Sequence, residues 1–156
     1  SKEGILALGD ATGKGMFTHA GDKEVEVAWH NAFHESKVAM DFTLVPHAVF
    51  TEPQIASVGL TESQAAKDHD IIAAKASYSD TVQGDIRKID EGFAKAVIEK
   101  NTGRILGFHI IGPDAAVLIQ EVVNVFAQKG DYRSITNAMH IFPSLSDLIT
   151  ETLDKV

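Results

Sequence analysis

Residues 92–111 read GFAKAVIEKNTGRILGFHII, in which two β-rich runs flank Asn101-Thr102-Gly103. The first run alternates from residue 93 to residue 99, which is the period of a strand with two different faces. A three-residue loop with glycine last suits a type I turn that is closed by a left-handed residue. This stretch therefore predicts a β-hairpin, and it indicates the kind of fold to expect around it.

Further elements are expected on both sides of the hairpin. The sequence predicts strands within residues 43–51, 56–60 and 71–78, and helices over residues 62–68 and 114–129. The helix over residues 114–129 is apolar on more than one face, which indicates burial on two sides. The predicted fold class is α+β, with a mainly antiparallel sheet flanked by helices.

Two of these helices have recognisable starts. Thr61 and Gln64 have the spacing of a capping box, in which the Thr hydroxyl accepts from the residue 64 amide and the Gln reaches back. Pro143 is followed by Ser144, which we expect to be the N-cap of a last helix.

The first forty residues predict a separate strand and helix. Residues 5–8 are a short apolar run that stops at Gly9-Asp10, the pattern of a strand buried on both faces. Over residues 18–40 the apolar side chains fall at helical spacing. The chain begins without Met and without a secretory core. We therefore expect a piece of a longer protein.

Composition excludes several function classes. The 14 Lys+Arg against 22 Asp+Glu give a net charge of −8, which offers no electrostatic footprint for nucleic acid or an anionic membrane. No apolar run approaches the roughly 18–20 residues that span a bilayer. There is no Cys, so a disulfide, a thiolate nucleophile and a thiolate metal site are all excluded within this chain. The expected compartment is the cytoplasm.

Several local motifs fail on their spacing. Residues 9–15 (GDATGKG) have three residues, not four, between the first Gly and Gly-Lys, and no Ser or Thr follows the Lys, so a phosphate loop is not predicted. His30 and His34 would share a helix face, but Asn31 replaces the Glu of a metalloprotease helix and no third ligand is evident. We expect no metal site.

Asp10 has two possible roles. An Asp just after a buried strand often hydrogen-bonds its own turn. It also lies where ligands bind, in the crevice at the carboxyl end of an α/β sheet. Residue type alone favours the first role.

A longer sequence pattern favours the second role of Asp10, ligand binding. Residues 5–10, Gly13 and the four residues Met16, Phe17, Thr18 and His19 together resemble the second flavin motif of the FAD-dependent pyridine nucleotide–disulfide oxidoreductases, whose members include dihydrolipoamide dehydrogenase and mercuric reductase. The resemblance implies that Asp10 hydrogen-bonds a ribityl hydroxyl of FAD. It also implies that residues 16–19 begin a helix whose N-terminus faces flavin O2, where free N–H groups and the helix dipole favour negative charge.

The remainder of the chain resembles the same family. Residues 49–62, 102–113 and 118–121 are similar to the opening, the central hairpin and the interface helix of its C-terminal interface domain. The resemblance implies that residues 1–42 end an FAD-binding domain and that residues 43–156 form the interface, or dimerisation, domain. It further implies a homodimer that works together with the rest of the parent chain.

The sequence departs from the family where thiol-reducing members end with His-x-His-Pro-[Thr/Ser]-x-x-Glu. Residues 140–147 read HIFPSLSD, so that Phe142 stands at the acid/base His and Asp147 at its Glu. A phenyl ring cannot accept a proton. With no His to orient, Asp147 is expected to serve as the capping partner of Ser144. Substitution by His140 is not favoured, because the family pattern has a His there as well.

The parent enzyme is expected to pass electrons from NAD(P)H through FAD to an acceptor. This segment would supply the dimer interface, part of the flavin pocket and an apolar wall at Phe142. Because the family's redox cysteines and glycine fingerprints do not occur in it, we expect it to be inactive alone and to hold no FAD stably. The alternative is a non-catalytic, stand-alone dimerisation module. Asp10 and residues 16–19 argue against it, because such a module has no need of a flavin motif.

Overall fold

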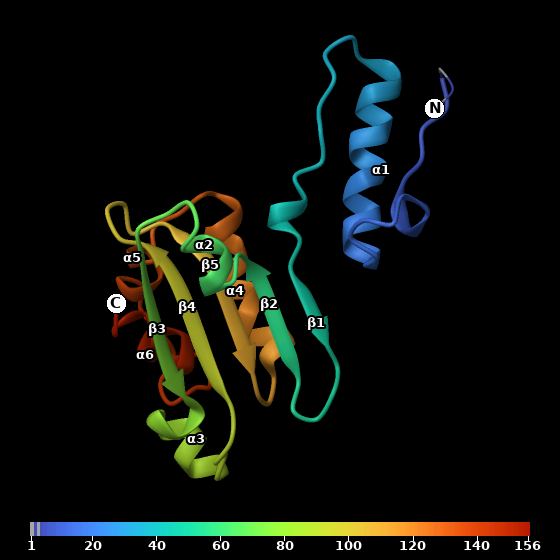
Figure 1. Ribbon diagram of the computed structural model, residues 1–156. Coiled ribbons are helices and arrows are strands. Elements are labelled where there is room, and N and C mark those ends of the chain that lie inside the picture. Colours follow the sequence, from blue (N-terminus) through green and yellow to red (C-terminus); the bar gives the residue numbers. More distant parts are fainter. Residues whose placement is uncertain (1, 3) are drawn as a thin grey trace. The chain divides into compact units, whose positions relative to one another are not determined.

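The computed structural model describes residue 2 and residues 4–156 of the chain (Figure 1). The chain forms two compact units, residues 1–45 and residues 46–156.

The second unit is built on a five-stranded sheet with the order β1-β2-β5-β4-β3, in which all neighbours are antiparallel. The strands are β1 (His47–Val49), β2 (Ile55–Gly59), β3 (Ile71–Ser77), β4 (Phe93–Glu99) and β5 (Ile105–Ile111). The predicted hairpin is confirmed as β4 and β5, and β5 is the middle strand. The α+β class is also confirmed.

Five helices accompany this sheet among the described residues: α2 (Glu62–Ala65), α3 (Val82–Arg87), α4 (Ala115–Ala127), α5 (Arg133–Thr136) and α6 (Asp147–Leu153). Figure 1 shows α4 and α6 behind the sheet and α2 in front of it. α4 packs on β2 and β5, whereas α6 packs on β3 and β4. The sheet can approach these helices closely because its covered face is rich in alanine, with Ala56, Ala94 and Ala96 fully buried.

The core lies between that face and the two helices. Phe108 and Ile110 of β5 are buried there, together with Val122 of α4 and Leu148 and Ile149 of α6. Removing a fully buried Phe or Leu side chain typically costs about 2–5 kcal/mol, so this layer supplies much of the stability of the unit.

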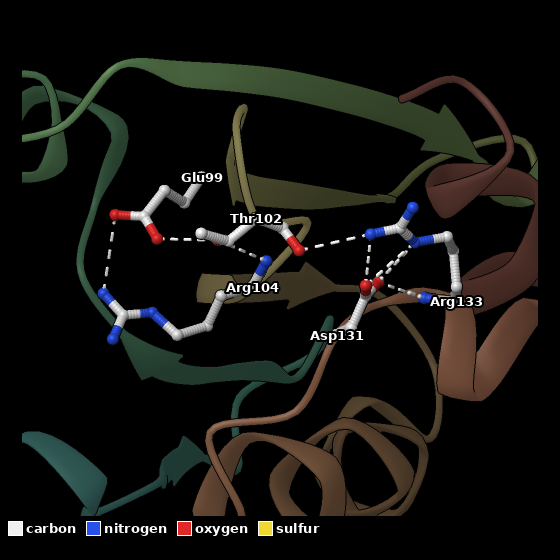
Figure 2. Close-up of polar contacts among 5 residues, drawn as sticks. All are labelled: Glu99, Thr102, Arg104, Asp131 and Arg133. Atoms are coloured by element: carbon white, nitrogen blue, oxygen red, sulfur yellow. Dashed lines mark hydrogen bonds and ion pairs between the residues drawn. The ribbon is translucent and has the colours of Figure 1, made fainter.

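The turn of the hairpin is tied to the α4–α5 connection by polar contacts (Figure 2). The Thr102 hydroxyl donates to Glu99 Oε2 at 2.7 Å, and Arg133 Nη2 donates to the Thr102 carbonyl at 3.2 Å. Arg133 also forms a bidentate pair with Asp131, in which Nε donates to Oδ1 and Nη2 donates to Oδ2. Gly103 has φ +75°, as predicted for the left-handed residue that closes the turn.

Some predicted boundaries in this unit are wrong. The helix expected over residues 62–68 ends at Ala65, although its capping box is present: Thr61 Oγ1 accepts from the Gln64 amide. α3 and α5 were not predicted. α5 is a single turn, too short to show periodicity, and α3 contains Gly84, where a Cβ would meet the Tyr78 carbonyl oxygen at 1.9 Å.

The first unit contains the 3₁₀ turn η1 (Gly9–Thr12), the helix α1 (Thr18–Phe33) and the 3₁₀ turn η2 (Phe42–Leu44). The strand expected over residues 5–8 is wrong, since these residues belong to no strand and Ile5 and Leu6 are exposed. A buried strand needs neighbouring strands, and the described part of this unit contains none.

The helix expected over residues 18–40 is also too long. α1 stops at Phe33, because the side chain of Asn31 pairs with the returning chain: Val38 N–H donates to Asn31 Oδ1 at 2.8 Å, and Asn31 Nδ2 donates to the Val38 carbonyl at 2.9 Å. A side chain that hydrogen-bonds a nearby backbone in this way competes with helix continuation.

The sheet face opposite α4 and α6 holds a partly buried imidazole. His109 Nε2 lies 3.1 Å from the Leu60 carbonyl oxygen, which can only accept, and His109 Nδ1 lies 3.1 Å from Ser57 Oγ. The neutral ring therefore carries its proton on Nε2 and accepts from the Ser57 hydroxyl. Burial lowers the pKa of His109 below its ordinary value of 6.5, and Lys95, which lies opposite it on β4, lowers the pKa further.

The free energy of unfolding should consequently fall as the pH drops below about 6.5, since the unfolded chain then binds a proton that native His109 does not accept. His109→Gln keeps hydrogen-bonding groups but cannot titrate, so the part of this loss that begins near pH 6.5 should disappear. Urea unfolding measured at intervals from about pH 7.5 to 5 checks this. Equal pH slopes for both proteins across that range would contradict it.

Candidate functional site

The candidate residues of the sequence analysis fall into two groups, one in each unit. The first group surrounds η1 and the start of α1. The second lies in the loop between α5 and α6.

The η1 turn displays Asp10. Gly9 has φ +65°, and the turn is closed by backbone acceptors: the Thr12 hydroxyl donates to the Gly9 carbonyl at 2.9 Å and the Gly13 N–H to the Asp10 carbonyl at 3.0 Å. Within the described residues no hydrogen bond engages the Asp10 carboxylate, which is exposed. The turn therefore forms without that carboxylate, which is available to a ligand.

The start of α1 lies a few residues further on. Thr18 is the first helical residue, and Phe17 is an extended N-cap with no side-chain capping hydrogen bond. The rings of Phe17 and His19 stack with centroids 5.6 Å apart, and Met16 is exposed. A helix of 16 residues without a capping side chain presents its N-terminal partial positive charge to whatever lies in front of it.

One residue of this region was missed by sequence reasoning. Glu24 of α1 is 9% exposed, and its Oε2 accepts from the Gly9 N–H at 2.6 Å. Glu24 lies four residues after Ala20 on the buried stripe of α1, where a carboxylate needs a partner. Only the folded structure shows that this stripe is buried.

In the second unit, the loop after α5 is apolar and exposed. Met139 is fully exposed, and Ile141 and Phe142 are 82% and 70% exposed. Phe142 offers no proton-transfer group, and its ring stands open to whatever approaches the loop.

His140 lies in the same loop but is held in place. Its Nε2 is 2.9 Å from Glu121 Oε1 on α4, and its Nδ1 is 3.0 Å from the Ala138 carbonyl oxygen. Both ring nitrogens of His140 therefore lie within hydrogen-bond distance of an oxygen atom of the same unit. With both nitrogens engaged, His140 has none left for proton transfer to a ligand. Glu121 is the second residue whose role the sequence analysis missed.

Asp147 interacts with the preceding turn. The Ser144 N–H donates to Asp147 Oδ2 at 3.3 Å, and the Ser146 N–H donates to Ser144 Oγ, also at 3.3 Å. The expectation that Ser144 is the N-cap is wrong: α6 begins at Asp147 and its N-cap is Ser146. The Asp147 carboxylate nevertheless makes the contact with Ser144 that a capping residue would make.

Among the residues that the structure describes, no group of three or more His, Asp or Glu side chains could hold a metal ion. His30 and His34 stack on each other with ring centroids 4.3 Å apart. None of the described helices is long and apolar enough to cross a bilayer.

Comparison with protein families identifies the second unit. The model of the pyridine nucleotide-disulphide oxidoreductase dimerisation domain matches residues 45–153. The chain belongs to this family. The resemblance seen in the sequence is thereby confirmed for the dimerisation domain.

Curated relatives in the pyridine nucleotide-disulphide oxidoreductase family are longer than this chain. Dihydrolipoyl dehydrogenase 3 of Haloarcula marismortui is 36% identical over 97% of this chain and 32% of its own length. Mycothione reductase of Mycobacterium tuberculosis is 34% identical over 98% of this chain and 35% of its own length. The chain thus spans about one third of the relatives it matches.

Solved structures of the family agree with the fold. LpdA of Mycobacterium tuberculosis superposes with a TM-score of 0.88 at 25% identity, covering 97% of this chain and 33% of that protein. The Cu(II) complex of the HOCl-induced flavoprotein disulfide reductase RclA of Escherichia coli gives a TM-score of 0.85 at 25% identity, over 97% and 35% of the two chains.

The contact between His140 and Glu121 can be tested directly. Glu121→Ala should lower the free energy of unfolding by about 1 kcal/mol, because the pair is partly exposed, and should speed amide exchange in residues 138–141. Glu121→Gln retains an acceptor oxygen, so its free energy of unfolding should fall less and its loop should exchange more slowly than in Glu121→Ala. Hydrogen exchange with mass spectrometry on the wild type and both variants checks the exchange of this loop. Exchange in Glu121→Ala equal to that in the wild type would show that Glu121 does not hold the loop.

Proposed function

We propose that this chain is the C-terminal part of an FAD-dependent oxidoreductase that passes electrons from NAD(P)H through FAD to an acceptor. The main support is the order of the parts along the chain. A turn that exposes Asp10 and a helix α1 without a side-chain cap come before residues 45–153, which match the dimerisation-domain model. In this proposal residues 1–42 complete an FAD-binding domain and residues 43–156 form the interface domain. The remaining two thirds of the parent would supply the nucleotide sites and any redox cysteines.

The residues of the first unit fit one end of a flavin. The Asp10 carboxylate is exposed and unengaged within the described residues, and a Cβ at Gly9 or Gly13 would meet nothing within 4 Å. A bound FAD would supply the hydride and electron-transfer chemistry of the reaction. Asp10 would accept a hydrogen bond from a ribityl hydroxyl. Residues 16–19 would direct the N-terminus of α1 at the pyrimidine, where its partial positive charge favours negative charge.

The second unit would shape the acceptor site and close the dimer. Phe142 stands at the position of the acid/base His, Asp147 contacts Ser144, and both nitrogens of His140 are engaged. These contacts support an acceptor site with an apolar wall and no histidine acid/base. An acceptor of quinone type, which needs no positioned proton donor from this loop, suits such a wall. The segment by itself is proposed to be inactive and to hold no FAD stably.

The source reading frame decides between this proposal and a stand-alone dimerisation module. Sequencing upstream should find a Gly-x-Gly-x-x-Gly fingerprint, and the full-length product should purify with a flavin absorbance band. A stop codon directly upstream, or a colourless full-length protein, would favour the module.

The isolated chain should be a dimer or larger. Val117 on α4 is 74% exposed, and the loop that His140 ties to α4 exposes Met139 and Phe142. In this proposal a second copy would cover these apolar side chains. Obligate pairs bury about 2,000 Å² or more. Light scattering at micromolar concentration checks this, with Val117→Lys expected to weaken the dimer and Val82→Lys, on α3, to leave it intact. A clean wild-type monomer would contradict the prediction.

The full-length enzyme should be poor with dithiols and better with a quinone. A positioned acid–base typically supplies 10²–10⁴-fold, about 3–5 kcal/mol of barrier, and Phe142 supplies none. Phe142→His should therefore raise kcat/KM for dihydrolipoamide relative to that for the quinone, with the same nicotinamide.

Two outcomes would contradict this assignment. Fast dithiol turnover in the wild type that Phe142→His does not change would show that the role given to Phe142 is wrong. Loss of dithiol turnover in His140→Ala would show that His140 performs the proton transfer.

A further inference from the structure

Glu24 of α1 is a buried carboxylate that is not among the proposed flavin contacts, which are Asp10 and residues 16–19. It is 9% exposed, and the Gly9 N–H, fifteen residues away in the sequence, donates to its Oε2 at 2.6 Å. Burying an ionised carboxylate is costly unless hydrogen bonds compensate, so this contact is the reason the side chain can lie there.

The surroundings of Glu24 explain how the two segments meet. Ala20 and Glu24 lie four residues apart on the buried stripe of α1, and the η1 turn packs against this helix. A Cβ on Gly15 would lie 3.3 Å from the Ala20 Cβ, and one on Gly21 would lie 3.7 Å from the Gly9 Cα. Small residues thus allow a close approach, and Glu24 then reaches the Gly9 amide.

The hydrogen bond acts at the start of the turn that displays Asp10. Gly9 is left-handed and is followed directly by Asp10. A glycine has more conformational freedom than any other residue, so the direction of the turn depends on what holds its amide. Fixing the Gly9 N–H against α1 fixes the orientation in which the next residue presents its carboxylate.

We propose that Glu24 is a positioning residue that holds the Gly9–Asp10 turn against α1 and thereby sets the affinity of Asp10 for the ribityl hydroxyls of a flavin nucleotide. This inference rests on the proposed function. Glu24 acts through Asp10 and does not itself touch the ligand.

The experiment uses the full-length flavoprotein and measures FAD affinity by the recovery of flavin fluorescence on dissociation. Glu24→Ala should weaken FAD binding about 10-fold or more, equivalent to about 1.4 kcal/mol. Glu24→Gln keeps an oxygen that can accept from the Gly9 N–H and should stay within a few-fold of the wild type. Glu26→Ala, at an exposed position on the same helix, is the matched control and should leave the affinity unchanged.

A double-mutant cycle separates positioning from a general loss of stability. If Glu24 acts through Asp10, Glu24→Ala should weaken FAD binding far less in an Asp10→Ala background than in the wild type. Additive losses would overturn the proposal, as would wild-type affinity in Glu24→Ala.

Amide exchange in the apo protein gives a readout that does not depend on flavin. The Gly9 N–H should exchange faster in Glu24→Ala than in Glu24→Gln or the wild type, and equal exchange would overturn the proposal. A full-length wild type that binds no FAD would instead overturn the proposed function. Gly9 exchange would then still report whether Glu24 holds the turn.

Discussion

The antiparallel pairing of β4 with β5 is the constraint on which the second unit depends. β5 is the middle strand, and its register with β4 and β2 decides which side chains face α4 and α6. At Gly107 a Cβ would lie 2.0 Å from the Leu60 carbonyl oxygen, so the chain leaving β2 can cross β5 only at a glycine. The same crossing leads into α2. One hairpin thus sets the sheet order, the covered face and the position of the chain that follows β2.

Both candidate sites use the same physical device. A carboxylate on a helix holds a loop that carries the residue of interest: Glu24 of α1 holds the Gly9 amide beside Asp10, and Glu121 of α4 holds the His140 ring beside Phe142. A helix is a rigid support, and a charge-assisted hydrogen bond is stronger than a neutral one. Each loop can therefore remain irregular and exposed at its tip while its base is fixed.

The loop around Phe142 combines fixed polar contacts with an open apolar surface. His140 and Asp147 direct their polar atoms back into the unit, towards Glu121 and Ser144, while Ile141 and Phe142 point their apolar side chains outwards. Such a surface offers apolar contact but no proton-transfer group.

The sequence alone determined the elements that have a local signal. Alternation and a glycine turn predict the hairpin, the Thr61–Gln64 spacing predicts a cap, and motif order predicts the family. Tertiary structure decided what depends on distant partners: α1 ends at Phe33 because Asn31 pairs with Val38, and residues 5–8 form no strand because no described strand lies beside them. Glu24 and Glu121 belong to this second class. Their partners lie 15 and 19 residues away, and no local pattern records a contact that only folding creates.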